Sequence, residues 1–358
     1  MIIMIKTDGK YKPDFAVPPG DTLVETIDTK NMSQKELSER TGLTTKTINL
    51  IIQGKAPITP DTAYKFESVL GMPAGFWINL ENNYQETIKR LEIEKQAEKE
   101  KWILEKIDYN QLVRLDWIKK ACSQNEKVIN LWKYFEVSSL ANLKSVYPGL
   151  LRKGCSENVS NYAVIAWITR GLKIAKEIKT EPYNKNKLKS LIPKIRNLSK
   201  KENFYEELFN LCSGAGISFV ILPHLNKTFV QGATNWISPD KALLLLSMRY
   251  KWMDVFWFTF FHELGHILMH SKKKLFVECK NENGELEKEA NEFAANTLID
   301  PKIYTRFVGK LHFTRESITG LASEIGVHPS IVIGRLAYDN RIHYSQFRDL
   351  RPLLKFTK

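Results

Sequence analysis

Residues 257–270 read WFTFFHELGHILMH, and this stretch decides the fold of the C-terminal part of the chain. Two histidines and a glutamate interrupt a run of apolar residues that would otherwise form a core helix. On a helix, His262 and His266 project from one face about one turn apart, so their imidazoles can hold a single ion. Glu263 follows directly, where its carboxylate can reach a water on that ion. The spacing predicts a buried helix that carries metal chemistry.

A second segment offers the third ligand that a catalytic zinc site requires. ELEKEANEFAANTLIDP, residues 285–301, predicts a helix with Glu287 near its start and Asn291 one turn later. We expect Glu287 to complete a His, His, Glu set and Asn291 to hold the second nitrogen of a ligand histidine in the correct tautomer. Three carboxylates remain rival ligands: Glu289, Glu292 and Asp300. We interpret His270, four residues past His266, as lying behind the ligands or at the surface.

The chemistry expected of this set is hydrolysis of a peptide bond. Zinc lowers the pKa of water toward about 7, and Glu263 takes the proton as that water attacks a carbonyl. The strand ALLLLSM, residues 242–248, is the expected substrate track: if it forms a sheet edge beside the predicted buried helix, an extended peptide can pair with it through backbone hydrogen bonds. The candidates for stabilising the oxyanion are Tyr250, Tyr304, His328 and Arg335.

Three short β-rich runs precede the helix that carries His262 and His266, here called the metal helix. They predict a small sheet: GAGISFVILPHL, TFVQGATNWIS and KALLLLSMRY. Helical segments are expected around residues 252–271 and 286–299, which gives an α+β arrangement. Residues 108–212 are helical by pattern. The predicted fold class is therefore mainly α with a smaller α+β part.

The N-terminal part carries a helix-turn-helix pattern in SQKELSERTGLTTKTINLIIQGK, residues 33–55. Ser33 is the expected first cap, Gly42 the turn and Thr44 the start of the second helix. The second helix exposes polar side chains that suit base edges and phosphates in a major groove. The predicted DNA-binding residues are Gln34, Thr44, Thr45, Lys46, Asn49 and Gln53.

These patterns predict four regions. They are a helix-turn-helix domain over residues 1–83, a linker helix over 84–110, a helical middle region over 111–212 and a zincin-like metallopeptidase domain over 213–358. The linker helix offers a possible homodimer contact. A second helix-turn-helix-like segment, residues 317–342, could read DNA, but its apolar second helix favours packing on the peptidase domain.

Composition limits the choice of class. The net charge is +13, yet residues 1–90 carry 11 basic and 11 acidic side chains, which weakens the electrostatic case for DNA binding. Four widely spaced cysteines without a CxxC pair argue against a disulfide framework and a cysteine-bound zinc ribbon. We expect a cytoplasmic protein, because no run of about 18 apolar residues and no secretory signal pattern is found.

FWFTFFHELGHILMH with EKEANEFAANTLIDP is similar to the ImmA/IrrE family of metallopeptidases, in which a zincin helix pair is often joined to an XRE domain. The resemblance covers residues 20–350, and its N-terminal part resembles the XRE/Cro-type domain of the HigA antitoxin branch. It implies a zinc-dependent endopeptidase with His262, His266 and Glu287 as ligands and Glu263 as base. Members typically cut or inactivate a helix-turn-helix repressor or antitoxin.

Three functions remain open. The preferred one is a zinc endopeptidase, joined to an operator-binding module, that acts on a repressor- or antitoxin-like protein in a mobile-element, stress, toxin–antitoxin or phage-defence system. The first alternative is a non-catalytic transcriptional regulator or antitoxin that uses the metallopeptidase fold as sensor or scaffold. The second is the toxin component of a defence module. The complete motif favours an enzyme, since Glu263 contributes chemistry and not metal affinity.

Overall fold

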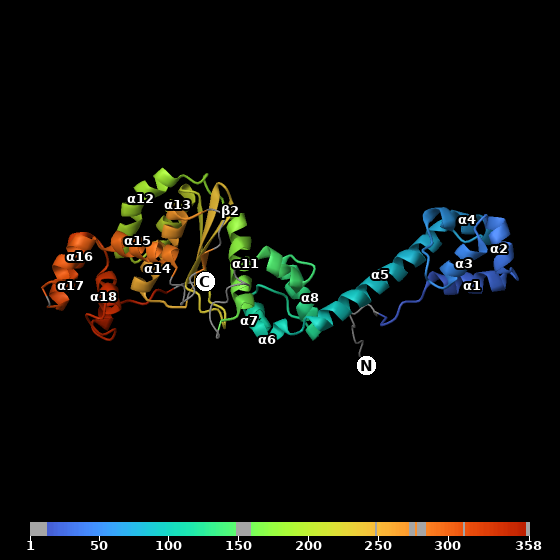
Figure 1. Cartoon of the computed structure of the whole chain (residues 1–358), viewed down its shortest axis with the longest axis horizontal. Helices are drawn as coiled ribbons and strands as arrows, with labels where there is room; N and C mark the ends of the chain where they lie inside the picture. Colours follow the sequence, from blue (N-terminus) through green and yellow to red (C-terminus); the bar gives the residue numbers. More distant parts are fainter. Residues whose placement is uncertain are drawn as a thin grey trace, which may run out of the picture. The chain divides into compact units, whose positions relative to one another are not determined.

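The structure, a computed structural model, describes residues 13–147, 159–247, 249–271, 276–277, 284–310 and 312–355. The chain divides into two compact units, Met1–Lys101 and Trp102–Lys358 (Figure 1). Both are rich in helices and the second contains a small sheet, which confirms the predicted fold class. Among the helices that the structure describes, none combines the length and the apolarity that crossing a bilayer requires.

The first unit is a bundle of five helices around one apolar core. The helices are α1 Pro19–Thr29, α2 Gln34–Thr41, α3 Thr45–Ile52, α4 Pro60–Leu70 and α5 Ala74–Lys99. The core includes Leu37 of α2, Ile48 of α3 and Trp77 of α5, all fully buried. The linker helix predicted over residues 84–110 is not one continuous helix: residues 84–99 form the second part of α5, and residues 103–106 form the separate helix α6 of the second unit.

The turn between α2 and α3 is built as the sequence predicts. The Ser33 hydroxyl accepts from the Glu36 N–H at 3.1 Å and so caps α2. The Thr44 hydroxyl accepts from the Thr47 N–H at 3.0 Å and caps α3. Gly42 between them has a φ of 69°, a left-handed conformation that favours glycine. The sharp turn that gives a helix-turn-helix its shape is therefore encoded locally.

The second unit begins with the helical region that the pattern predicts over residues 108–212. Its helices are α6 Ile103–Lys106, α7 Tyr109–Arg114, α8 Gln124–Phe135, η1 Leu140–Asn142, α9 Leu143–Val146, α11 Asn161–Glu177, α12 Lys185–Asn197, η2 Leu198–Lys200 and α13 Tyr205–Gly214. Of these, α11 matters most for the site, because it packs against the sheet that follows.

The sheet confirms the three predicted strands and adds a short fourth. The strands are β1 Ile217–Leu222, β2 Gly232–Ser238, β3 Lys241–Ser247 and β4 Phe276–Val277, in the spatial order β1-β3-β2-β4. β3 pairs in parallel with β1 and antiparallel with β2. The prediction that residues 242–248 form a sheet edge is therefore wrong, since both edges of β3 are occupied by neighbouring strands.

Helices cover both faces of the sheet. Ala242, Leu244 and Leu246 of β3 belong to the core cluster shared with α14, Met253–Met269. On the opposite face, Leu245 lies against Gly171 of α11, where an added Cβ would come within 2.6 Å of it. Burial on both faces explains why β3 is a continuous apolar run and not an alternating one.

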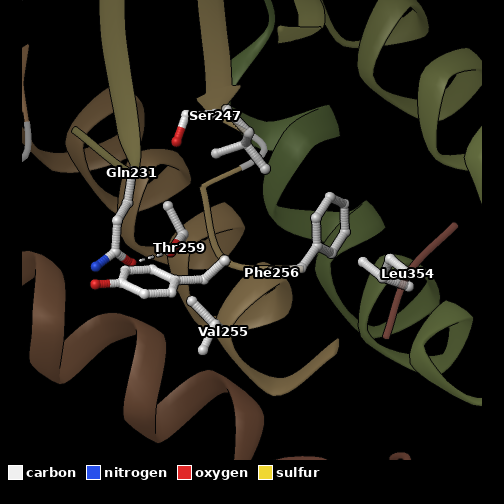
Figure 2. A pocket seen from close by; sticks show the side chains of 8 residues that line it. Gln231, Ser247, Val255, Phe256, Thr259 and Leu354 are labelled. Atoms are coloured by element: carbon white, nitrogen blue, oxygen red, sulfur yellow. Dashed lines mark hydrogen bonds between the residues drawn. The ribbon is translucent and has the colours of Figure 1, made fainter. Parts of the chain in front are cut away.

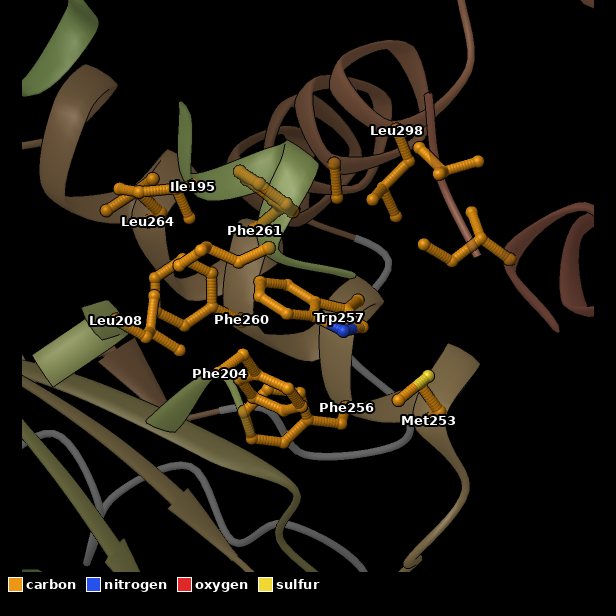
Figure 3. Close-up of a cluster of buried hydrophobic side chains, with 14 of the residues drawn as sticks. Ile195, Phe204, Leu208, Met253, Phe256, Trp257, Phe260, Phe261, Leu264 and Leu298 are labelled. Atoms are coloured by element: carbon orange, nitrogen blue, oxygen red, sulfur yellow. The ribbon is translucent and has the colours of Figure 1, made fainter. Parts of the chain in front are cut away.

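The helix α14 is the centre of the second unit. Its aromatic side chains Trp257, Phe260 and Phe261 are fully buried and pack among Phe204 and residues of neighbouring helices (Figure 3). α15 Glu285–Leu298 packs closely along α14 at Gly265. An added Cβ on Gly265 would meet the Phe293 ring at 3.0 Å, so glycine allows the two helices to approach.

The remaining helices are α16 Pro301–Val308, α17 Arg315–Ile325, α18 Pro329–Tyr338 and η3 Arg348–Leu350. α17 and α18 form the second helix-turn-helix-like segment, and α18 packs against α14. Ile331, Val332 and Ile333 of α18 are buried, so this segment packs on the second unit, as its composition favours.

The C-terminal segment fixes the start of α14. Arg351 donates to the Asp254 carboxylate at 2.8 Å, and both side chains are buried. Beside this ion pair, the Met253 N–H donates to the Pro352 carbonyl at 3.2 Å. The first turn of the helix is thus held by residues nearly one hundred positions later in the chain.

Candidate metal centre

Two helices bring the three predicted ligands together. His262 and His266 come from α14 and Glu287 from α15. The two Nε2 atoms lie 3.0 Å apart, and the Glu287 oxygens lie 3.1 Å from His262 Nε2 and 3.4 Å from His266 Nε2. These atoms form a group that could hold a metal ion. Both histidines are buried, whereas the Glu287 side chain keeps 12% of its surface exposed, so the site has a route to solvent.

Asn291 fixes the orientation of His262. Its Oδ1 lies 2.9 Å from His262 Nδ1. An amide oxygen only accepts hydrogen bonds, so His262 Nδ1 carries the proton and Nε2 presents its lone pair to His266 and Glu287. The residue one turn after Glu287 therefore supports a ligand, as its spacing predicts.

His266 has a different support. Its Nδ1 lies 2.8 Å from His270 Nδ1, and His270 Nε2 lies 3.0 Å from Glu289 Oε2. Glu289, which the sequence offers as a rival ligand, thus contacts His270 and does not belong to the group formed by His262, His266 and Glu287. The spacing of four residues between His266 and His270 indicates that their side chains can contact each other on one helix face. No pattern in the sequence predicts the contact between Glu289 and His270.

Glu263 is fully buried, and β2 approaches it closely. An added Cβ on Gly232, the first residue of β2, would lie 2.4 Å from Glu263 Oε1. Only glycine leaves room for the carboxylate at this point. Sequence reasoning missed Gly232, because its role depends on a contact between distant segments.

Burial and hydrogen bonding set the protonation of the group. Burial lowers the pKa of His266, because the charged imidazolium is disfavoured away from water. Burial acts to raise the pKa of Glu287, but the interactions with His262 and His266 outweigh it and lower that pKa to about 2. A neutral imidazole beside an ionised carboxylate is the state that a divalent cation requires.

The other rival ligands lie elsewhere. Glu292 is exposed on α15. Asp300 caps α16, where its Oδ1 accepts from the Lys302 and Ile303 N–H groups. Neither belongs to the group formed by His262, His266 and Glu287.

Three of the four oxyanion candidates are engaged in other bonds. The Tyr304 hydroxyl donates to Asp339 at 2.6 Å, and Arg335 Nε donates to the same carboxylate at 2.9 Å. His328 caps α18, with its Nδ1 accepting from the Ser330 N–H at 3.1 Å. The fourth, Tyr250, lines a hollow beside α14.

Val255, Phe256 and Thr259 of α14 line this hollow (Figure 2). Thr259, one turn before Glu263, donates to Gln231 Oε1 at 3.3 Å, and Gln231 precedes the glycine that contacts Glu263. Ser247 at the end of β3 and Leu354 of the C-terminal segment also line the hollow. Tyr250 is thus the oxyanion candidate that lines the same hollow as Thr259 and Gln231, the residue directly before Gly232.

The predicted DNA-binding residues gather at the helix-turn-helix. Five are exposed on or next to α3, and Gln34 is half-buried at the start of α2. Gln53 Nε2 donates to Asn49 Oδ1 at 3.2 Å, so these two amides form a connected polar surface one turn apart. The exposed set is Thr44, Thr45, Lys46, Asn49 and Gln53.

An N-terminal and a C-terminal part of the chain each match a known protein family. Residues 27–77 match the family model described as helix-turn-helix, and residues 254–336 match the model described as IrrE N-terminal-like domain of the peptidase M78 group. The second match spans α14, α15 and the helices up to α18. It therefore contains the whole candidate metal centre.

Individual relatives resemble the N-terminal part. The uncharacterized HTH-type transcriptional regulator YddM of Escherichia coli strain K12 is 34% identical over 64 residues, which are 18% of this chain and 68% of that regulator. An addiction module antidote protein of the HigA family from Coxiella burnetii is 29% identical and covers 24% of this chain and 94% of its own, with a TM-score of 0.22.

Proposed function

Because the chain belongs to the helix-turn-helix regulators through its N-terminal unit and carries an IrrE-like peptidase domain, we propose that it is a zinc-dependent endopeptidase joined to a DNA-binding module. His262, His266 and Glu287 are the proposed zinc ligands, and Glu263 is the proposed general base. One observation carries this proposal: two imidazole nitrogens and a carboxylate from two helices converge within hydrogen-bonding distance of one another.

The donor set suits zinc. Two neutral imidazoles and one carboxylate are ligands that zinc accepts, and three protein ligands leave a fourth position for water or substrate. The support for each histidine fits as well, since Asn291 directs the lone pair of His262 toward the centre. Wide, all-oxygen sites are typical of calcium or magnesium instead.

A zinc ion held here would polarise a peptide carbonyl and acidify a water molecule. Glu263 would accept the proton of the attacking water and deliver it to the leaving amine nitrogen. Its burial against Gly232 restricts the carboxylate to few positions, which favours a defined proton transfer. The apolar side chains around α14 exclude water from the far side of the helix.

The sheet suggests where a substrate would lie. β2 contacts Glu263 through Gly232, and β4 pairs with β2 at Ala233 and Thr234 as the outermost strand of the described sheet. We therefore propose that an extended substrate peptide pairs with the edge formed by β4, and not with β3. An extended peptide added there would gain backbone hydrogen bonds and lie on the β2 side of the centre.

The helix-turn-helix supplies the proposed link to DNA and to a partner. The exposed polar face of α3 is suited to a major groove, and the relative YddM is named as a transcriptional regulator. We propose an operator close to the protein's own gene as the DNA target. The protein substrate in this proposal is a helix-turn-helix repressor or antitoxin, as the ImmA/IrrE resemblance implies.

The decisive experiment compares the wild type with Glu263→Gln. Both proteins are purified, analysed for zinc and co-expressed with the repressor-like products of neighbouring genes. We expect equal zinc content and a loss of cleavage of about 10²–10⁴-fold in the variant, because the amide cannot accept the proton. Unchanged cleavage by Glu263→Gln would exclude the proposed mechanism.

A further inference from the structure

Behind the candidate centre, a chain of three side chains leads from His266 toward solvent. His266 Nδ1 meets His270 Nδ1 at 2.8 Å, and His270 Nε2 meets Glu289 Oε2 at 3.0 Å. The His270 side chain is 2% exposed and that of Glu289 is 51% exposed. His270 follows the last residue of α14, whereas Glu289 lies on α15, so the chain connects the two helices that carry the ligands.

The direction of each hydrogen bond follows from the last acceptor. An ionised carboxylate only accepts, so His270 Nε2 carries a proton. A neutral imidazole with a proton on Nε2 has a lone pair on Nδ1, which accepts from His266 Nδ1. His266 is then left with its lone pair on Nε2, the nitrogen that lies 3.0 Å from His262 Nε2.

We propose that His270 and Glu289 are positioning residues that hold His266 in the Nδ1–H tautomer and fix the direction of its Nε2 lone pair. We call the hydrogen-bonded series His266–His270–Glu289 the relay. The proposal rests on the proposed zinc function, because the expected consequence of losing the relay is weaker zinc binding. Asn291 performs the same task for His262 with a neutral amide. The two ligand histidines are therefore supported by different groups.

A purely structural role for His270 and Glu289 is the competing explanation. A half-exposed hydrogen bond such as that between His270 and Glu289 contributes only modestly to the stability of a fold. The His270 side chain is buried between Glu289 and His266, so we expect its loss to affect His266 itself. Groups that orient ligand histidines typically change metal affinity by about 10–100-fold when they are removed.

The first test measures the tautomer in the metal-free full-length protein. The ¹⁵N chemical shifts of His266 distinguish a proton on Nδ1 from one on Nε2. We expect Nδ1–H in the wild type and a shift toward Nε2–H in His270→Ala. His270→Gln should restore the wild-type state, because its amide oxygen can accept from His266 and its NH₂ can donate to Glu289.

The second test measures affinity for zinc alone by competition with a chromophoric chelator, and the absorption of the cobalt-substituted protein. We expect about 10–100-fold weaker zinc binding in His270→Ala, a smaller loss in Glu289→Ala and near wild-type binding in His270→Gln. Glu285→Ala is the matched control, since it removes an exposed carboxylate from the same helix. Circular dichroism shows whether each variant is folded.

The outcomes separate the two proposals. A wild-type protein that binds no zinc overturns the proposed function, while the nitrogen shifts still decide whether the relay exists. An unchanged His266 tautomer in folded His270→Ala overturns the relay, and so does wild-type zinc affinity with an unaltered cobalt spectrum. A loss in His270→Gln equal to that in His270→Ala would assign His270 a structural role only.

Discussion

The position of Glu263 depends on a residue without a side chain. Gly232 at the start of β2 lies so close that any Cβ would overlap the carboxylate. The contact joins a strand and a helix that are about thirty residues apart, and it leaves Glu263 fully buried. At the scale of single residues, the centre is thus defined by close packing as much as by its ligands.

Replacing Gly232 by alanine tests this packing. We expect Gly232→Ala to displace Glu263 and to destabilise the second unit by about 1–3 kcal/mol, because the added methyl has no room. Zinc content should remain, since the ligands are untouched, while cleavage falls. Gly320→Ala on α17 is the control, because its Cβ meets nothing within 4 Å. Equal stability and activity of the two variants would contradict the tight contact.

Acid release of zinc is a second expectation at this scale. Burial lowers the pKa of His266 below its ordinary value of 6.5, so the imidazole stays neutral as the pH falls to that value. It takes up a proton only below it and then can no longer bind the ion. We expect zinc content, measured after equilibration at each pH, to be constant above pH 6.5 and to fall at lower pH. Loss that begins above pH 6.5 in a folded protein would refute this.

Much of the centre could be predicted from the sequence. The spacing of His262 and His266, and of Glu287 and Asn291, follows helical geometry and required only that two helices pack side by side. Gly232 and Glu289 could not be found in this way. Their contacts depend on how separate segments are placed in three dimensions, which no local pattern encodes.

At the scale of elements, the start of α14 is fixed by distant parts of the chain. Its first turn carries Asp254, whose carboxylate pairs with Arg351 in the interior. An added Cβ on Gly334 of α18 would lie 2.6 Å from the same carboxylate, so α18 also approaches closely. The register of the metal helix therefore depends on the C-terminal segment.

Removing the cation of this buried pair should be costly. We expect Arg351→Met to destabilise the second unit by about 3–5 kcal/mol, because Asp254 is left buried without its partner. Adding Asp254→Asn should recover part of the loss. The exposed pair Arg306–Glu324 gives the control, with Arg306→Met expected to change stability by less than about 1 kcal/mol. Denaturant unfolding measures all three; a similar effect at both arginines would disprove the argument.

The strands show where an element pattern was informative and where it was misread. Gly, Pro and Asn between β-rich runs located β1, β2 and β3 correctly. The run LLLL in β3 does not lie at a sheet edge, because β3 pairs with β1 on one side and with β2 on the other. Strand order depends on contacts between distant segments, including the packing of α11 and α14 on the sheet, and no single run encodes these contacts.

At the scale of the whole molecule, the chain joins two kinds of recognition. The first unit carries a helix-turn-helix and the second an IrrE-like peptidase domain, and each has its own apolar core. Residues 1–90 have no net charge, so we expect attraction to the phosphate backbone to be modest and the proposed base contacts by α3 to matter more.

The double variant Lys46→Ala with Asn49→Ala tests the DNA module. We expect operator affinity of the full-length protein to fall about tenfold or more, because a phosphate contact and a base contact are lost together. Fluorescence anisotropy at two salt concentrations measures it. Lys89→Ala, exposed on α5 of the same unit, controls for the loss of charge. If the wild type retains no DNA fragment even at low salt, the module recognises protein instead.

The central place of β3 has a consequence for the lifetime of the centre. β1 and β2 occupy its two edges, while α11 and α14 cover its faces. Deuterium from solvent would reach its amide protons only when the whole second unit opens. The metal helix α14 packs directly on β3, so the geometry of the proposed ligands should persist through the local fluctuations that open outer helices and loops.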